Sequence, residues 1–270
     1  MVIFIMIEFF SNLSPIYQAL IAALFTWSVT ILGASIVFFF KKVKKGIMDA
    51  LLGFSAGVMI AASFWSLLNP AIEMANSLKM NSCFIAFVGF FSGGLLLFIG
   101  DKIYTHFSKK KSISNDKIKR CAMLIFSITL HNIPEGLVVG VAFGSLVYNI
   151  PGSSLASAIT LAIGIGLQNF PEGSAISLPL RREGISRKKS FFYGQLSGIV
   201  EPISAVLGAI LVLKIRTILP FLLSFAAGAM IYVVVEELIP ESQTNKRKDL
   251  MALFTLIGFS VMMILDISLG

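Results

Sequence analysis

Apolar runs of about 20 residues recur along the whole of this 270-residue chain, and no other feature constrains the fold as strongly. A helix needs about 20 apolar residues to cross a hydrocarbon layer of ~30 Å. Lipid excludes isolated strands, and a barrel would show short alternating segments rather than continuous runs. The sequence therefore predicts an all-α integral membrane protein in which residues 1–270 form one transmembrane domain. The eight expected spans cover about 17–40, 47–68, 83–101, 121–147, 153–180, 190–213, 218–239 and 250–269.

The composition agrees with this fold class. Hydrophobic residues make up 56% of the chain and charged residues only 13%, whereas soluble domains hold about 45–50% and about 25%. This balance excludes a soluble enzyme, a disulfide-rich secreted scaffold and a disordered chain. The formal net charge of +8 leaves nucleic-acid binding open until the basic residues are located.

The basic residues are distributed asymmetrically between alternate loops. Nineteen of the 22 Lys and Arg lie in the loops 41–45, 102–120, 181–189 and 241–249, and the other three lie in the opposite set. Cytoplasmic loops of membrane proteins are enriched in Lys and Arg. We therefore predict an even number of spans with both termini extracytoplasmic, and no nucleic-acid partner.

A short internal repeat relates the second and seventh spans. Phe-Ser-Ala-Gly-Val-Met-Ile at 54–60 matches Phe-Ala-Ala-Gly-Ala-Met-Ile at 225–231 in five of seven positions, and a proline follows each segment. Because the two spans would run in opposite directions, the match indicates an inverted repeat, which is common in transporters. The alternative is that small residues simply recur in packed membrane helices.

Three acidic residues lie deep within the predicted spans, where charge is costly and usually functional. They are Glu135, Glu172 and Glu201. Two of them belong to similar sequences, His-Asn-Ile-Pro-Glu-Gly at 131–136 and Gln-Asn-Phe-Pro-Glu-Gly at 168–173.

The spacing within these motifs places their polar groups together. Residues four apart share a helix face, so His131 stacks with Glu135 and Gln168 with Glu172. The asparagine of each motif is rotated by about 100° and stays near the same side. Each proline frees a carbonyl that a neighbouring helix or a polar cavity must satisfy. Imidazole, amide and carboxylate groups that converge in this way suit a divalent cation.

Other interpretations of the polar residues stay open. The acids could relay protons, and the amides could be structural hydrogen-bonding groups between helices. The chain has two His and carries no His-Glu-x-x-His motif, nucleophile elbow or phosphate-binding loop, which disfavours a metallohydrolase and an ATP-driven pump.

At these residues the sequence resembles the ZIP (Zrt/Irt-like) divalent metal transporters. The motif at 168–173, with Ser-Ala-Gly-Val-Met at 55–59 and Phe-Trp-Ser-Leu-Leu at 64–68, is similar to the bacterial GufA-like branch. The resemblance implies eight helices in a 3+2+3 arrangement, with spans one to three and six to eight as inverted repeats around a central pair. It also implies a bacterial cytoplasmic (inner) membrane location.

The resemblance further implies a binuclear metal centre halfway across the membrane. One metal would be held by His131, Glu135, Gln168 and Glu172, and a second by Asn132, Glu135, Asn169, Glu172 and Glu201. Many family members have His in place of Gln168, and some have Asp in place of Asn169. A neutral amide in each place lowers the charge and donor strength of the site.

The implied function is movement of a divalent transition metal into the cytoplasm by alternating access, with zinc first and Cd²⁺, Fe²⁺ and Mn²⁺ as further substrates. We expect no enzyme activity and no prosthetic group. The expected partners are the metal ions and the lipid bilayer, and a homodimer is an open option. The alternatives are a channel-like divalent cation pore and a membrane metalloenzyme. By the same resemblance, metal would leave past Asp101, His106, Glu236 and Glu237, with interfacial charges that anchor the helix ends as the alternative. Asp266, near the outer end of the eighth span, would attract cations at the entrance.

Overall fold

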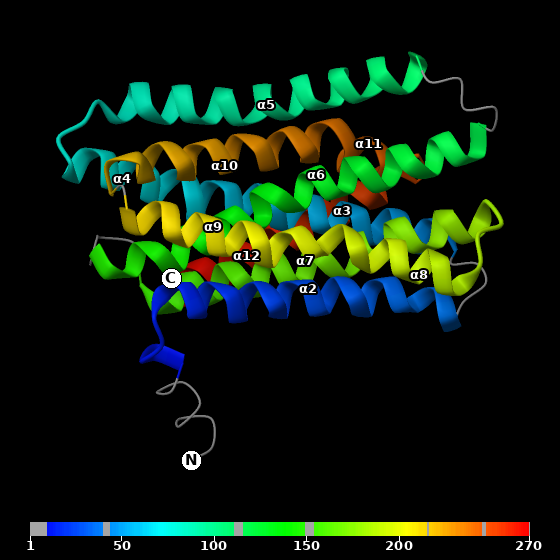
Figure 1. Ribbon diagram of the computed structural model, residues 1–270, viewed down its shortest axis with the longest axis horizontal. Coiled ribbons are helices and arrows are strands. Elements are labelled where there is room, and N and C mark those ends of the chain that lie inside the picture. Colours follow the sequence, from blue (N-terminus) through cyan, green and yellow to red (C-terminus); the bar gives the residue numbers. More distant parts are fainter. Residues whose placement is uncertain are drawn as a thin grey trace.

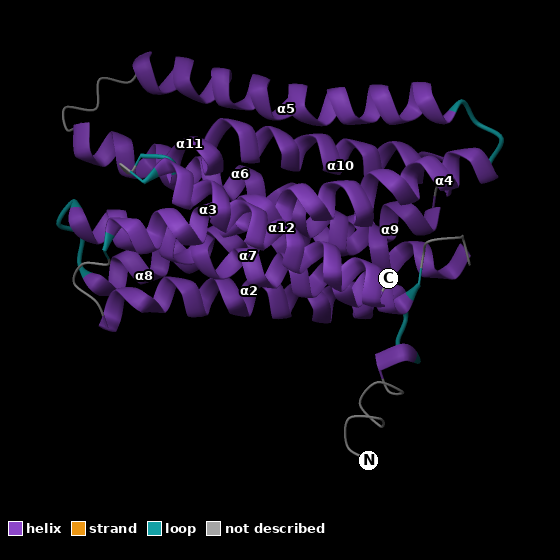
Figure 2. Ribbon diagram, turned by 180° about the vertical axis from the view of Figure 1, so that it is seen from behind, coloured by secondary structure: helices purple, strands orange, loops and turns teal. Residues whose placement is uncertain are grey.

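The protein is a bundle of helices that run along one long axis (Figure 1). The computed structural model describes residues 10–39, 44–110, 116–148, 154–214, 216–244 and 247–269, and within these ranges every regular element is a helix (Figure 2). The principal helices are α2 (Pro15–Phe39), α3 (Lys45–Ala62), α4 (Asn69–Ser77), α5 (Ser82–Lys110), α6 (Asp116–Ser145), α7 (Leu155–Arg182), α8 (Arg187–Leu196), α9 (Val200–Lys214), α10 (Leu219–Val233), α11 (Ile239–Ser242) and α12 (Lys248–Leu269).

Short segments join some of these helices into longer rods. The π-helical segment η1 (Ser63–Leu68) connects α3 with α4, and a second one, η5 (Val234–Leu238), connects α10 with α11. The 3₁₀ turn η3 (Ser197–Ile199) connects α8 with α9. Such π segments occur frequently near functional sites. The two here follow the two copies of the repeated sequence at the same distance.

Six of the described rods are long and apolar enough to cross a membrane. They are Pro15–Phe39, Lys45–Ser77, Ser82–Ile103, Arg187–Lys214, Leu219–Ser242 and Lys248–Ser268. In α6 only the shorter stretch Asn132–Tyr148 is comparably apolar, and α7 does not qualify because its polar motif interrupts the apolar run. The structure thus confirms an all-helical membrane protein, while the count of eight spans stays a prediction.

The helix ends differ from the predicted span ends on the basic side. The segment 102–120 was expected to be a loop, yet α5 continues to Lys110 and α6 already begins at Asp116. Lysine is a good helix former, so the backbone can stay helical beyond the apolar layer. At the opposite end of the bundle, the rod that begins with α3 continues beyond the predicted span end at residue 68 to Ser77, with Pro70 in the first turn of α4.

Four pairs of helices pack most closely: α2 with α7, α6 with α9, α5 with α10, and α3 with α12. Glycines allow their backbones to touch, as in membrane helix pairs generally. Between α3 and α12, a Cβ on Gly57 would overlap the carbonyl of Thr255, and one on Gly258 would overlap the carbonyl of Phe54.

The pair formed by α5 and α10 repeats this reciprocal contact. A Cβ on Gly228 would overlap the carbonyl of Phe90, and one on Gly93 would overlap that of Phe225. Gly228 and Phe225 hold the same places in one copy of the internal repeat as Gly57 and Phe54 hold in the other. The two copies therefore make matching contacts with different partner helices.

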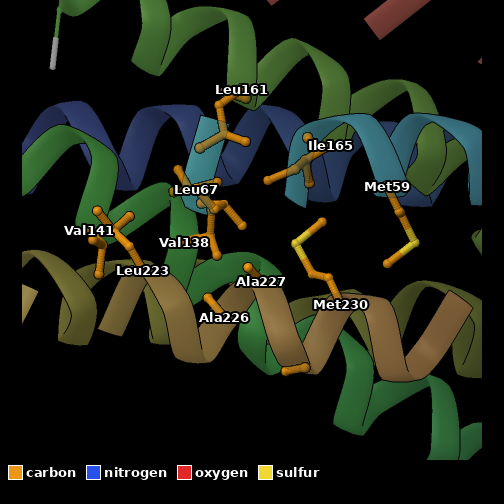
Figure 3. Packing of buried hydrophobic residues seen from close by; sticks show 14 of the residues in the cluster. Met59, Leu67, Val138, Val141, Leu161, Ile165, Leu223, Ala226, Ala227 and Met230 are labelled. Atoms are coloured by element: carbon orange, nitrogen blue, oxygen red, sulfur yellow. The ribbon is translucent and has the colours of Figure 1, made fainter. Parts of the chain in front are cut away.

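An apolar core lies between the two copies of the repeat. Met59 of α3 and Met230 of α10, which correspond in the repeat, both extend into the space between their helices (Figure 3). Leu67 and Leu223 fill the same cluster further along, together with Val138 from α6. This packing leaves α5 at one side of the bundle (Figure 1), where its phenylalanines Phe84, Phe87 and Phe91 are exposed.

The described helices show which of their ends share one end of the bundle. The helix α2 begins at the same end at which α12 finishes, as Figure 1 shows. At the other end α5 finishes and α6 begins, and the connection from α7 to α8, one of the predicted basic loops, lies there as well.

Candidate metal site

The glycine that ends each repeated motif sets the position of the site. A Cβ on Gly136 would overlap the backbone carbonyl of Glu201, so α6 and α9 touch directly there. A Cβ on Gly173 would similarly overlap the carbonyl of Thr30, so α7 and α2 touch at the second motif. Both helix pairs are thus in direct backbone contact where the acidic residues lie.

The structure brings together the predicted site residues whose side chains it describes. They are buried or nearly so: Asn132, Glu135, Gln168, Asn169, Glu172 and Glu201. The amide of Gln168 donates a hydrogen bond of 2.5 Å to Oε1 of Glu135, which joins α7 to α6. The carboxylates of Glu172 and Glu201 lie within electrostatic reach of Glu135. His131 lies on α6 one turn before Glu135, and its side chain falls outside the described residues.

The carboxylate of Glu201 is held by three donors. Its Oε2 accepts hydrogen bonds from the Thr26 hydroxyl at 2.5 Å and from the Asn169 amide at 2.9 Å. Its Oε1 accepts a longer one, 3.4 Å, from the Thr30 hydroxyl. Thr26 and Thr30 were not predicted from the sequence, because hydroxyls are common in membrane helices and only the helix packing brings these two to Glu201.

A second contact that was not predicted from the sequence connects α3 with the motif on α7. The hydroxyl of Ser55, which belongs to the repeated segment of the second span, donates to the carbonyl of Gln168 at 3.2 Å. Serine and threonine commonly hydrogen-bond across membrane helices in this way. The contact ties the internal repeat to the central helices.

Several buried oxygens at the site have no hydrogen-bond partner within the described part of the chain. They are Oδ1 of Asn132, Oε2 of Glu135, Oε1 of Gln168 and Oδ1 of Asn169; the amide nitrogen of Asn132 is unpaired as well. An unsatisfied buried polar atom costs about 1–3 kcal/mol. Four such oxygens, contributed by both motifs, form an acceptor set that a cation could satisfy.

Acidic residues alone do not form this set. Among the described residues, no three His, Cys, Asp or Glu side chains gather closely enough to hold a metal ion. Neutral amide groups of Asn132, Gln168 and Asn169 are buried beside the carboxylates, and they add oxygens without adding negative charge. The site is therefore a mixed carboxylate and amide one.

The other acids named from the sequence lie towards the two ends of the bundle. Asp266 of α12 is nearly buried and accepts a hydrogen bond of 2.8 Å from the Ser66 hydroxyl of η1. Asp101, Glu236 and Glu237 all lie within electrostatic reach of Tyr232 on α10. Glu237 also lies within reach of Glu172 at the central site. The side chain of His106 is outside the described residues.

The fold and the site define a multi-pass membrane protein with a buried polar centre, and comparison with known proteins supplies the family. The family model described as "ZIP Zinc transporter" matches residues 117–266. The chain is 38% identical to human "Zinc transporter ZIP11" over 95% of its length and 98% of the relative's. It is 32% identical to "Zinc transporter GufA" of Myxococcus xanthus, with 93% and 98% covered. "Zinc transporter ZIPB" of Bordetella bronchiseptica is 31% identical, with 90% and 79% covered.

The chain belongs to the ZIP zinc transporter family. The resemblance stated from its two motifs is thereby confirmed, and so is the expectation of a membrane transport protein rather than an enzyme. The ligand roles of individual residues stay predictions.

Proposed function

We propose that the protein carries zinc and related divalent cations across a bilayer, and that the cation binds between α6 and α7. The observation that supports this most directly is the set of buried acceptor oxygens on Asn132, Glu135, Gln168 and Asn169 that have no partner within the described residues. Together with the carboxylate of Glu172, these oxygens could replace the water that a divalent cation sheds at the midplane. His131 would add an imidazole nitrogen from the same face of α6.

Alternating access would expose this site to each side of the membrane in turn. The matching glycine contacts of α3 with α12 and of α10 with α5 support a 3+2+3 arrangement of eight spans with inverted repeats. In such transporters one group of helices moves against another around a fixed site. The π segments η1 and η5 interrupt the regular helix at corresponding places in the two repeats.

Acidic groups would guide the cation on either side of the site. Asp266 with Ser66 lies towards the end where α12 finishes. Glu237 lies within electrostatic reach of Glu172, and Asp101 lies near the same tyrosine as Glu237. The basic connections favour a cytoplasmic position for that second end. Transport would then run from Asp266 through the centre towards Glu237 and into a bacterial cytoplasm.

Zinc uptake by purified protein in liposomes tests the proposal. Wild type should show saturable uptake, and Glu172→Ala should reduce it about tenfold or more because a buried ligand is lost. The control is Glu241→Ala, since this acid lies exposed on α11, outside the site. Equal uptake by wild type and Glu172→Ala would overturn the site. Uptake without saturation, accompanied by single-channel currents, would favour a channel-like pore instead.

A further inference from the structure

The three donors to Glu201 come from two helices that are themselves fixed to each other. Thr26 and Thr30 lie one turn apart on α2, and Asn169 lies on α7. At Gly173 and Gly33 the backbones of α2 and α7 are in direct contact, so these donors keep their relative positions. Glu201 on α9 therefore binds to a preformed group of donors.

The orientation of the Asn169 amide follows from its neighbours. Its Nδ2 lies 2.9 Å from the carboxylate of Glu201 and 3.2 Å from the backbone carbonyl of Thr26. Both neighbours are acceptors only, so the amide group must present its nitrogen to them. An aspartate in this place would put a negative oxygen against a carbonyl and a carboxylate. The backbone of α2 therefore favours asparagine at position 169 and turns its Oδ1 away from Glu201.

The carboxylates of Glu135 and Glu201 differ in the hydrogen bonds that they already accept. Glu135 accepts one hydrogen bond, from Gln168, and its second oxygen is unpaired within the described residues. Oε2 of Glu201 accepts two hydrogen bonds, from the Thr26 hydroxyl and the Asn169 amide, and Oε1 accepts the longer one from Thr30. Hydrogen bonds to a buried charged group are stronger than those between neutral groups. A cation must displace the Thr26 hydroxyl to reach Oε2 of Glu201, whereas Oε2 of Glu135 has no such competitor.

We propose that Thr26 is a positioning residue that keeps Glu201 engaged with α2, so that the site takes one divalent cation rather than two. The proposal rests on the proposed function, because it concerns how many cations the same site holds. It assigns a cation to the acceptors on Asn132, Glu135, Gln168 and Asn169, and it makes Glu201 an anchor between α9 and α2. The negative charges of Glu135 and Glu172, one from each motif, would then be balanced by one divalent cation.

Counting bound metal tests this assignment. Purified protein in detergent is dialysed to equilibrium against Zn²⁺, and the ions bound per chain are measured at saturation. Wild type should bind one. Thr26→Val keeps the shape of the side chain but removes the shorter of the two hydrogen bonds to Oε2 of Glu201, which leaves this oxygen only the Asn169 donor. One of its lone pairs becomes available, so two ions should bind. Thr26→Ser restores a hydroxyl and should return the count to one.

Thr30→Val is the matched control on the same face of α2. Its hydroxyl lies 3.4 Å from Glu201, compared with 2.5 Å for Thr26, so its loss should leave the count at one. Asn169→Asp is a second variant. Its carboxylate should repel the carboxylate of Glu201 and separate it from its donors, so this variant too should bind two ions. Two ions on wild type, or one ion on both Thr26→Val and Asn169→Asp, would overturn the inference. Absence of any binding by wild type would overturn the proposed function itself.

Discussion

The motifs on α6 and α7 differ little in sequence, but their asparagines have different surroundings. Asn169 on α7 donates to Glu201 and to the backbone of α2. Asn132 on α6 is equally buried, yet neither its nitrogen nor its oxygen has a partner within the described residues. Gln168, which precedes Asn169, also donates across the helix pair, to Glu135. The amide nitrogens of the α7 motif thus hold the acids, whereas the Asn132 amide of the α6 motif makes no such contact within the described residues.

Alanine in place of the glycine that ends each motif should have the largest effect on stability, and it tests whether the two motifs are equivalent. Gly136→Ala and Gly173→Ala should each destabilise the protein by about 1–3 kcal/mol or more, because Cβ would overlap backbone that cannot move easily. Thermal unfolding in detergent measures the loss. Gly94→Ala is the control, since its nearest neighbour would be the carbonyl of Gly228 at 3.5 Å. Tolerance of alanine at only one of the two motifs would break the equivalence.

Acid should inhibit uptake, and the two motifs should contribute unequally. Protons compete with the metal for the carboxylates of Glu135 and Glu172 and for the imidazole of His131, so uptake should fall as pH decreases from neutral to mildly acid. Two of these groups belong to the α6 motif and one to the α7 motif. His131→Gln makes the first motif like the second, and its uptake should change less steeply over this range. Liposome uptake across a pH series measures both curves, and identical curves would contradict the assignment of His131.

Replacing each asparagine by leucine distinguishes a residue that stabilises the site from one that binds the metal. Asn169→Leu should cost about 1.5–3 kcal/mol of stability, because a buried carboxylate loses a donor. Asn132→Leu removes two unpaired polar atoms, so stability should change by less than about 1 kcal/mol, while zinc affinity should fall about tenfold. Thermal unfolding and equilibrium dialysis measure the two effects. Equal destabilisation by both variants would show that the motifs play the same part.

The support of the α7 motif by α3 predicts the smallest effect. Ser55→Ala removes the hydrogen bond to the carbonyl of Gln168 and should cost about 0.5–1.5 kcal/mol. Ser63→Ala is the control in the same rod, because that hydroxyl bonds only to the carbonyl of Met59 one turn earlier in its own rod. Thermal unfolding should rank Ser55→Ala below Ser63→Ala in stability. The reverse order would remove α3 from the support of the site.

Much of the site could be predicted because its residues stand out against an apolar background. Glu135, Glu172 and Glu201 attract notice in the sequence because burying a charge in a membrane helix is costly without a function. The repeated spacing of the motifs indicates that their amides share the same face. Thr26 and Thr30 could not be assigned in this way, since hydroxyls are common in membrane helices and only the packing of α2 on α7 and α9 brings them to Glu201.

The fold shows the same division between local and long-range information. Continuous apolar runs predict helices, because a helix satisfies its own backbone hydrogen bonds in lipid. The sequence did not reveal that α5 continues through Lys110 or that π segments follow both repeats, since apolar length says nothing about helix beyond the membrane or about helix–helix contacts.

The sequence by itself determined a helical membrane protein, its family and the residues of its central motifs, because hydrophobic length and motif spacing are local properties of the chain. The tertiary structure decided which of those residues face one another and which already have hydrogen-bond partners. Glu135 and Glu201 look alike in the sequence. They differ in the fold because α2 supplies the hydroxyls of Thr26 and Thr30 to Glu201. Within the described residues, Glu135 accepts a hydrogen bond from Gln168 alone.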